Sequence, residues 1–183
     1  MAVATSISFG SGGIPLDEAW HLLLHPDGSI ASGVIHDQRV PRTVVAAAVG
    51  TALGLAGAIM QSLTRNPLAD PGILGVNTGA ALLVVCGIAF LGITSPLAYL
   101  GLALVGAAVT AVFVYFVGSV GPGGATPIKL ALAGAATTAA LSSLVAAILL
   151  PRRSAMNDFR FWQVGSVARA EWDTMALVLP LII

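Results

Sequence analysis

The sequence predicts an all-α protein, a polytopic bundle of transmembrane helices, and three observations carry that prediction. Hydrophobic residues make up 57% of the 183 residues, and charged residues make up only 9%. The mean hydropathy is +0.94, well into the apolar range. Charges are also missing over long stretches, which run from Arg42 to Arg65, from Asp70 to Lys129, and from Lys129 to Arg152. Uncharged blocks of this length are typical of helices that cross a lipid bilayer.

The balance of charge argues against two classes of partner. Eight basic and eight acidic residues give a formal net charge of zero, so neither a nucleic-acid-binding surface nor an acidic surface for cationic partners is expected. The one cysteine, Cys86, has no partner within the chain and lies in an apolar run, where we expect it to pack as a small hydrophobe. The first eight residues lack the basic and apolar blocks of a secretory signal, so no cleavable signal is expected.

The first predicted element is a short helix over residues 14–24. Pro15 stands near its start, Asp17 and Glu18 fall in its first turn, and His25 and Pro26 end it.

One face of this helix is apolar. That face either packs against the protein or lies on the membrane surface, and we favour packing because the opposite face is weakly charged. Its residues are Leu16, Trp20, Leu23 and Leu24. His21 and His25 stand four apart without a third ligand nearby, so a metal site is not expected there.

The crossings follow, if roughly 20 residues are allowed for each. We place them at 43–63, 77–91, 97–117 and 130–150, and a fifth begins near Trp172. The second crossing is short by this measure, and the turn at 92–96 that follows it consists of helix-ending residues. Four complete crossings and the start of a fifth are therefore expected.

Small residues recur along the crossings. In lipid, where apolar burial gives helices little reason to associate, such seams allow backbones to approach closely. The first crossing carries Gly50, Gly54, Gly57 and Ala58, and the third carries Gly101, Ala103, Gly106 and Ala107. We therefore expect a packed bundle and not a single membrane anchor.

The residues of catalysis are missing from the predicted crossings. No ionisable group lies deep within them, which disfavours a membrane enzyme or a proton-coupled carrier. The chain has no GxSxG elbow, and its only lysine, Lys129, is not part of a phosphate-binding GxxxxGK[ST] loop. We expect no catalytic residue, no metal site and no cofactor, and any ATP that drives the protein would bind to another subunit.

Three segments carry a more specific signal. The first is Arg39-Val40-Pro41-Arg42, and the second runs from Arg65-Asn66-Pro67-Leu68 through Asp70-Pro71-Gly72 to Ala80. The third is Phe161-Trp162-Gln163-Val164-Gly165-Ser166, which looks like an FWxxGS segment. Together with the LALAG stretch at 130–134, these segments resemble the FecCD (BtuC-like) permease family, and the resemblance covers nearly the whole chain.

The resemblance implies a function and a set of partners. Members of the family are membrane subunits of binding-protein-dependent ABC importers for iron-siderophores, haem and cobalamin. It implies an ATP-binding subunit, an extracytoplasmic substrate-binding protein, a second permease subunit and a location in the bacterial plasma (inner) membrane. The chain would correspond to the second crossing through the start of the sixth, a fragment without the first crossing or the second half.

The resemblance also divides the chain, treated as a single partial permease domain over 1–183. Residues 1–42 would form an extracytoplasmic segment with the short helix, and 43–150 would hold the four crossings. Residues 151–171 would form an extracytoplasmic loop, and 172–183 would start the next crossing. Six of the eight basic residues lie on the Arg39 side, which the positive-inside rule would place in the cytoplasm. We follow the resemblance, which places that side outside.

The resemblance assigns a docking site for the binding protein to Arg39 and Arg42. Arg39 matches the family's outer-face arginine, which pairs with a glutamate of that protein. In the alternative interpretation both arginines anchor the helix end at the interface. Phe159, Phe161 and Trp162 either contact the binding protein or form an interfacial aromatic belt, and we favour the belt.

The resemblance assigns the cytoplasmic gate of the pathway to two further segments. On one side stand Asn66, Pro67 and Leu68, where closely spaced prolines forbid a continuous helix; a purely structural turn fits equally well. On the other side stand Thr126, Pro127 and Ile128. Members of the family carry serine and threonine on this second side, and the proline and isoleucine here depart from that pattern.

Two alternatives come from other classes. A passive channel is suggested because Asn66-Pro67-Leu68 resembles the NPA box of aquaporins, but that fold needs two facing boxes and this chain has one. A membrane enzyme or scaffold is disfavoured by the lack of buried ionisable groups.

Overall fold

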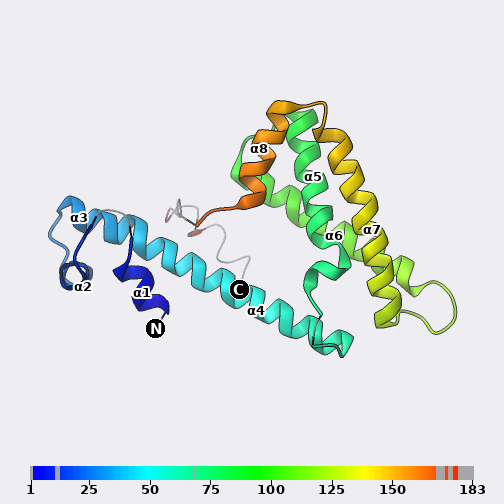
Figure 1. Cartoon of the computed structure of the whole chain (residues 1–183), viewed down its shortest axis with the longest axis horizontal. Helices are drawn as coiled ribbons and strands as arrows, with labels where there is room; N and C mark the ends of the chain where they lie inside the picture. The colour runs from blue at the N-terminus through cyan, green and yellow to red at the C-terminus, as the bar shows by residue number, and fades with distance from the viewer. Residues whose placement is uncertain (1, 11–12, 68, 168–171, 173–174, 177–183) are drawn as a thin grey trace. The chain divides into compact units, whose positions relative to one another are not determined.

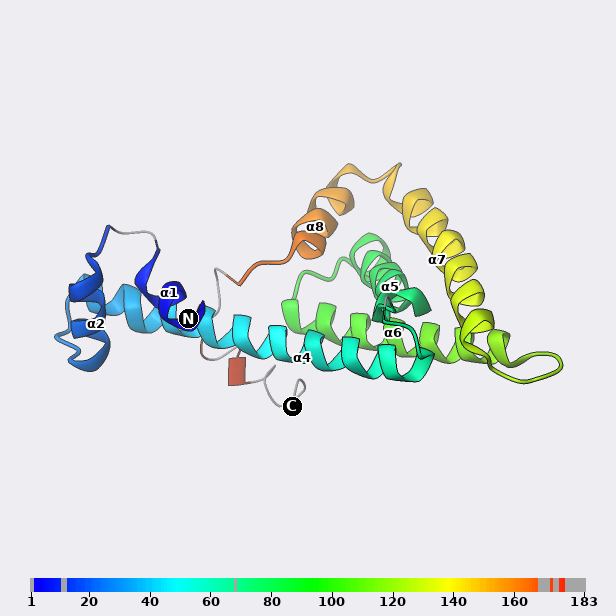
Figure 2. The same cartoon turned by 60° about the horizontal axis from the view of Figure 1, so that its bottom comes forward.

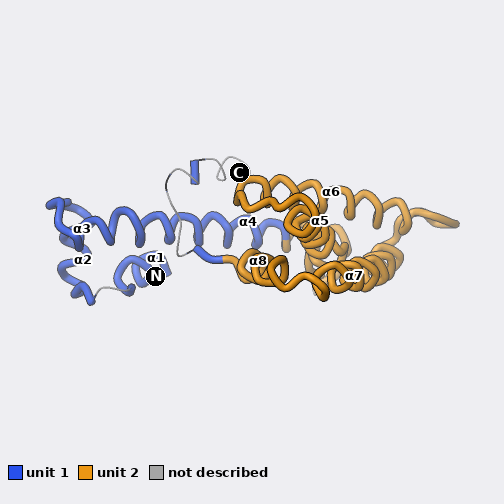
Figure 3. The backbone as a smooth tube through the Cα atoms, turned by 90° about the horizontal axis from the view of Figure 1, so that it is seen from above, with its two compact units in different colours: residues 1–56, 166–183 blue, residues 57–165 orange. Residues whose placement is uncertain are grey.

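The computed structural model describes residues 2–10, 13–67, 69–167, 172 and 175–176 (Figure 1). The described residues are largely helical, and no β-strand occurs among them. They form two compact units, of which the first comprises 1–56 with 166–183 and the second comprises 57–165 (Figure 3). Each unit is described by itself below.

Unit 1 is a run of short helices that leads into a long one. Its elements are α1 (Ala2–Ser8), α2 (Leu16–Leu24), α3 (Ile30–Gly33), the π-helix η1 (Val34–Arg39) and the first part of α4 (Val40–Thr64). In the turn before α3, hydrogen bonds from the Ser29 side chain and main chain hold the pKa of the exposed Asp27 carboxyl below its usual value. Ser29 also caps α3, because its side chain accepts a hydrogen bond from the Ser32 N–H at 3.1 Å.

Helix α2 confirms the predicted short helix, but the face that packs is different from the one expected. Ala19 and Leu22 are buried against Ile35 of η1. Of the apolar stripe only Leu23 packs against this cluster, as the favoured interpretation expected. That interpretation was wrong for Leu16, Trp20 and Leu24, which are 50%, 40% and 70% exposed. The stripe and the packed face are adjacent around the helix, so apolar spacing alone could not tell which of them meets the protein.

The first crossing begins earlier than predicted. Helix continues without a break from Ile30 to Thr64, whereas the sequence placed the start of the crossing at position 43. Pro41 lies within this helix, although a proline ring ordinarily clashes with the carbonyl four residues before it. The turns of η1 just before Pro41 are π-helical, and the N–H of Val40 bonds to the Ile35 carbonyl five residues back. This wider turn accommodates the proline within a continuous helix.

Unit 2 is a helical bundle around α5. It contains the 3₁₀ turn η2 (Pro71–Leu74), α5 (Val76–Leu91), α6 (Pro96–Ser119), α7 (Pro127–Leu149) and α8 (Arg153–Val164). Helix α5 contacts α6, α7 and α8, and it lies between α6 and α7 in Figure 2. The predicted turn at 92–96 is confirmed, because Gly92 adopts a φ of 63° after α5 and Pro96 opens α6.

The bend between α4 and α5 brings extended backbone close to α7. Helix α4 ends at Thr64, Arg65 adopts a left-handed φ of 49°, and the Asp70 side chain caps η2 by accepting the Gly72 N–H at 2.7 Å. A Cβ at Gly134 of α7 would overlap the carbonyl of Ile73. The η2 turn can therefore lie directly on the α7 backbone only because position 134 has no side chain.

The core of unit 2 lies where α5, α7 and α8 meet. Val84, Val85, Ile88, Leu149, Ala155 and Phe159 are buried there. The sequence predicts a loop over residues 151–171, whereas helix α8 forms within that range and packs Ala155 and Phe159 into this core.

Three helical segments are long and apolar enough to cross a membrane: Ile30–Thr64, Pro96–Ser119 and Pro127–Leu149. Helix α5 is equally apolar but shorter, as the sequence predicted. The chain is a multi-pass membrane protein. The predicted start of a further crossing at 172–183 lies mostly outside the described residues.

Candidate functional site

A cavity of about 280 Å³ lies in unit 2, where the end of α4, the bend after it and the start of α7 meet. Met60, Leu63 and Thr64 of α4 form one wall. Asn66 and Ala69 of the bend continue that wall, followed by Ile73 and Leu74 of η2. The opposite wall is the first turn of α7, with Pro127, Ile128, Leu130 and Ala131.

This cavity brings together residues from both sides of the predicted gate. Asn66 lines it from the bend, and Pro127 and Ile128 line it from α7. Pro67 and Thr126 are neighbours of lining residues but are not part of the described lining themselves. Leu68 lies outside the described residues. Two segments about sixty positions apart thus line one cavity.

Local hydrogen bonds place the two walls. The N–H of Asn66 donates to the Gln61 carbonyl at 3.2 Å, which turns the chain sharply at the end of α4. Thr126 caps α7, because its hydroxyl accepts from the N–H of Lys129 at 3.4 Å. Pro127 occupies the first helical position, where its missing N–H has no helical partner to lose. Ile128 is 74% exposed.

The lining of this cavity is uncharged. None of its lining residues is acidic, basic or a histidine. Its polar side chains are Thr64, whose hydroxyl donates to the Met60 carbonyl at 2.8 Å, and Asn66. Within the described residues no cluster of three or more His, Cys, Asp or Glu side chains could hold a metal ion.

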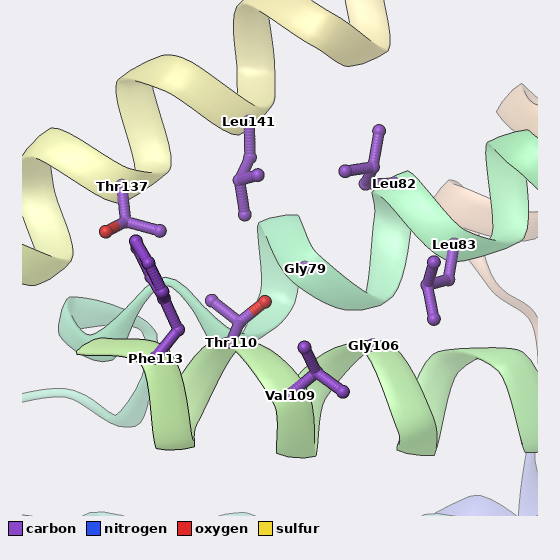
Figure 4. Close-up of a pocket in the computed structure, with 9 residues that line it drawn as sticks. All are labelled: Gly79, Leu82, Leu83, Gly106, Val109, Thr110, Phe113, Thr137 and Leu141. Carbon is purple, nitrogen blue, oxygen red and sulfur yellow. The ribbon is translucent and has the colours of Figure 1, made fainter. Parts of the chain in front are cut away.

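A second cavity, of about 270 Å³, lies among α5, α6 and α7 (Figure 4). Leucine, valine and phenylalanine side chains line most of it, together with Thr110 and Thr137. The Thr137 hydroxyl donates to the Ala133 carbonyl at 2.7 Å, so it is satisfied within its own helix. Thr110 points toward Gly79, where a Cβ would overlap its hydroxyl. None of the residues that line this second cavity is acidic, basic, histidine or cysteine.

A third cavity, of about 510 Å³, is more polar and was missed by the sequence analysis. It lies among α5, α7 and α8 and includes Asn77, Ser142, Arg160 and Gln163. The sequence contains no compact motif for this cavity, because its polar residues are spread over three helices, one of which the sequence does not predict.

The predicted docking arginines lie in unit 1, where both bind the end of α1. The Arg39 guanidinium donates to the carbonyls of Ile7 and Ser8 at 2.9 and 3.2 Å. Arg42 donates to the carbonyls of Ser6 and Phe9 at 2.9 and 3.2 Å.

The two arginines differ in exposure. Arg39 is only 2% exposed, whereas Arg42 is half-buried. The last carbonyls of a helix carry partial negative charge and have no partner within the helix, so cations bind there favourably. Both arginines therefore cap α1 in this structure, and Arg39 is turned into the protein.

The three aromatic residues assigned to docking or to an aromatic belt do not share one environment. Phe159 is 4% exposed and belongs to the core, so neither interpretation holds for it. Trp162 stacks on Phe159 with ring centroids 5.7 Å apart. Phe161 is 83% exposed and stays available for either role.

Comparisons with known proteins agree on one family. Residues 1–183 match the FecCD transport family. The ferric enterobactin transport system permease protein FepD of Escherichia coli is 41% identical over 184 residues, which cover 100% of this chain and 55% of FepD. The iron(3+)-hydroxamate import system permease protein FhuB of Bacillus subtilis is 41% identical over 175 residues, 95% of this chain and 45% of FhuB.

A solved structure supports the same relationship. It is an inward-facing ABC transporter of metal-chelate type, 25% identical to this chain, with a TM-score of 0.76. The similarity covers 98% of this chain and 54% of that one. This chain therefore spans about half the length of the relatives that it matches.

Proposed function

Because the chain belongs to the FecCD transport family, we propose that it is a permease subunit of a binding-protein-dependent ABC importer. Its substrate would be an iron-siderophore or a related metal chelate, in line with the enterobactin and hydroxamate permeases that it resembles. Its role would be to form part of the translocation pathway, with no chemistry on the substrate.

The observation that carries the proposal is the cavity shared by Asn66, Pro127 and Ile128. A gate that opens and closes needs two segments that can approach and separate. Here one segment follows the end of one spanning helix, and the other is the start of another spanning helix. The lining is uncharged, which suits a bulky chelate that must pass without being held tightly. We propose that Asn66, Pro67 and Leu68 form one side of the cytoplasmic gate and Thr126, Pro127 and Ile128 the other.

The docking site for the binding protein would lie at Arg39 and Arg42. Charge-assisted contacts between such arginines and acidic side chains guide association and fix register. Since Arg42 is the more exposed of the two, we propose that it makes the direct contact. Arg39 would hold α1 in place beside it.

The proposed importer needs two further membrane-associated subunits, an ATPase and a second permease. The chain has no phosphate-binding loop, so ATP hydrolysis would take place on a separate subunit. A second permease subunit would complete the pathway, and the location would be the bacterial plasma membrane.

Reconstitution into vesicles tests this function. The chain, a second permease subunit, a co-purified ATPase subunit and a binding protein would be tested for uptake of radioactive iron bound to catecholate, hydroxamate or citrate chelators. We expect uptake that needs both ATP and the binding protein. Uptake that continues when either is left out would support a passive channel instead, and no uptake of any chelate in the complete system would contradict the proposal.

A further inference from the structure

The only lysine of the chain, Lys129, binds the loop that precedes its own helix. Its ammonium donates to the carbonyls of Pro122, Gly124 and Val120, at 2.8, 3.1 and 3.4 Å. An ammonium has three N–H donors, and here each has an acceptor on the main chain. The loop thus wraps around the end of one side chain.

This loop cannot hold its shape by local preference alone. Gly121, Gly123 and Gly124 adopt positive φ angles of 89°, 84° and 66°. Glycine reaches such angles without strain, but it also loses more conformational freedom than any other residue when it is fixed there. A chain with three such glycines needs a contact from outside the loop to select one conformation, and the Lys129 ammonium supplies it.

The position of Lys129 in its helix supports a specific role. It is the third residue of α7, in the first turn, where the helix dipole disfavours a positive charge. The interaction with the helix dipole therefore does not stabilise a lysine at this position. The three carbonyls compensate the charge and explain why the side chain turns back over the loop.

The same turn of helix forms one wall of the candidate gate. Pro127, Ile128, Leu130 and Ala131 line the cavity opposite Asn66, and Lys129 lies between them in sequence without lining it. The side chain on one face of the turn holds the loop, while its neighbours face the cavity. Lys129 thus connects the loop to the helical turn that carries Pro127 and Ile128.

We propose that Lys129 is a positioning residue, which sets the cavity wall formed by Pro127 and Ile128 by binding the carbonyls of the 120–124 loop. Its importance for transport rests on the proposed function, but the positioning itself does not. The positioning role of Lys129 can therefore be tested without any transport assay.

The first experiment measures the mobility of the loop in the full chain in lipid nanodiscs. Cys86 is replaced by alanine, and a nitroxide is attached to a cysteine at Ala125. With Lys129, we expect an electron paramagnetic resonance spectrum typical of a nitroxide with restricted motion. With Lys129→Met, the nitroxide should be markedly more mobile, and Lys129→Arg should restore the restricted motion. The control Val120→Ala changes an exposed side chain but keeps the carbonyl acceptor, and it should leave the spectrum unchanged.

A second nitroxide position separates local from global effects. Ser143 is exposed on α7, well away from the loop, and a label there should give the same spectrum in all four proteins. Equal mobility at 125 with lysine and methionine would overturn the proposal. So would a loss of order at 143 together with 125, because the effect would then be general unfolding.

The second experiment measures the cavity wall. Cysteines at Asn66 and Ile128 are joined with a short bifunctional thiol reagent, and the rate is compared among the Lys129 variants. We expect the rate to fall several-fold with Lys129→Met and to recover with Lys129→Arg. An unchanged rate would overturn the positioning role. A failure of uptake in the reconstituted system, with these results intact, would contradict the proposed function and leave the positioning role standing.

Discussion

Asn66 and Ile128 line the same cavity, although one follows the first spanning helix and the other lies in the first turn of α7. Between them the chain forms the central helix α5 and the spanning helix α6. A movement of the bend after α4 relative to the start of α7 would change the volume of this cavity. The candidate gate can therefore be tested by substitutions that change the volume of the cavity and leave the fold intact.

The first prediction concerns Ile128. Replacement by tryptophan should fill much of the cavity and strongly reduce chelate uptake, while stability changes by less than about 0.5 kcal/mol, because the side chain is exposed. Leu132 is a matched control, since it is 67% exposed on the same helix and does not line the cavity. Its tryptophan variant should transport normally. Equal uptake by the two variants would argue against a gate at Ile128.

The second prediction compares two glycines of α6. A Cβ at Gly106 would overlap the Gly79 carbonyl of α5, whereas one at Gly101 would meet nothing within 4 Å. Gly106→Ala should therefore push α5 and α6 apart and destabilise the chain by about 1–3 kcal/mol. Gly101→Ala should stabilise it by roughly 0.5–1 kcal/mol, the usual gain inside a helix. Thermal unfolding in detergent measures both, and a Gly106→Ala variant as stable as the parent would show that the contact is not needed.

The third prediction concerns Arg39. Replacement by methionine should release the end of α1 and cost about 1.5–3 kcal/mol, as expected for a lost hydrogen bond to a charged group. Hydrogen exchange should become faster in residues 2–10 and stay unchanged in α5. Arg153 is exposed, and its methionine variant is the control. Unchanged exchange at the N-terminal segment in Arg39→Met would show that Arg39 does not hold α1.

Much of the bundle could be predicted because lipid imposes a simple rule on the sequence. A spanning helix must exclude charge for its whole length, so the uncharged blocks predicted both ends of α6 and α7 and the end of α4 within a few residues. The helix that contains α4 begins well before the predicted start, at Ile30. The break after Thr64 and the turn at Gly92 were also predictable, since proline and glycine act there through local sterics.

Other features depend on contacts that no local pattern reveals. The continuation of helix through Pro41 required the π-helical turn before it. Helix α8 is polar on average, with Arg153, Asp158 and Arg160 in its sequence, and its buried side chains include Phe159 in the core. Which face of α2 packs depended on the position of Ile35. The role of Lys129 likewise appears only once the loop carbonyls surround it.

The structure agrees better with the predicted positions of the gate residues than with the predicted exposure of Arg39. Asn66, Pro127 and Ile128 were assigned to one gate from a resemblance, and the structure places all three on one cavity. Arg39 was assigned to docking by the same route, yet its guanidinium is buried against the carbonyls that end α1. A sequence shows that an arginine is present but not which acceptors its side chain reaches.

The most direct test of the central claim is to lock the cavity and measure transport. The chain with Cys86→Ala, Asn66→Cys and Ile128→Cys is assembled with the proposed ATPase, binding protein and second permease subunit, and the two cysteines are joined by a short reagent that a reductant can cleave. We predict that joining them stops ATP-dependent uptake of the iron chelate and that reduction restores it, while each single-cysteine variant is unaffected by the reagent. Full uptake by completely cross-linked protein would contradict the account.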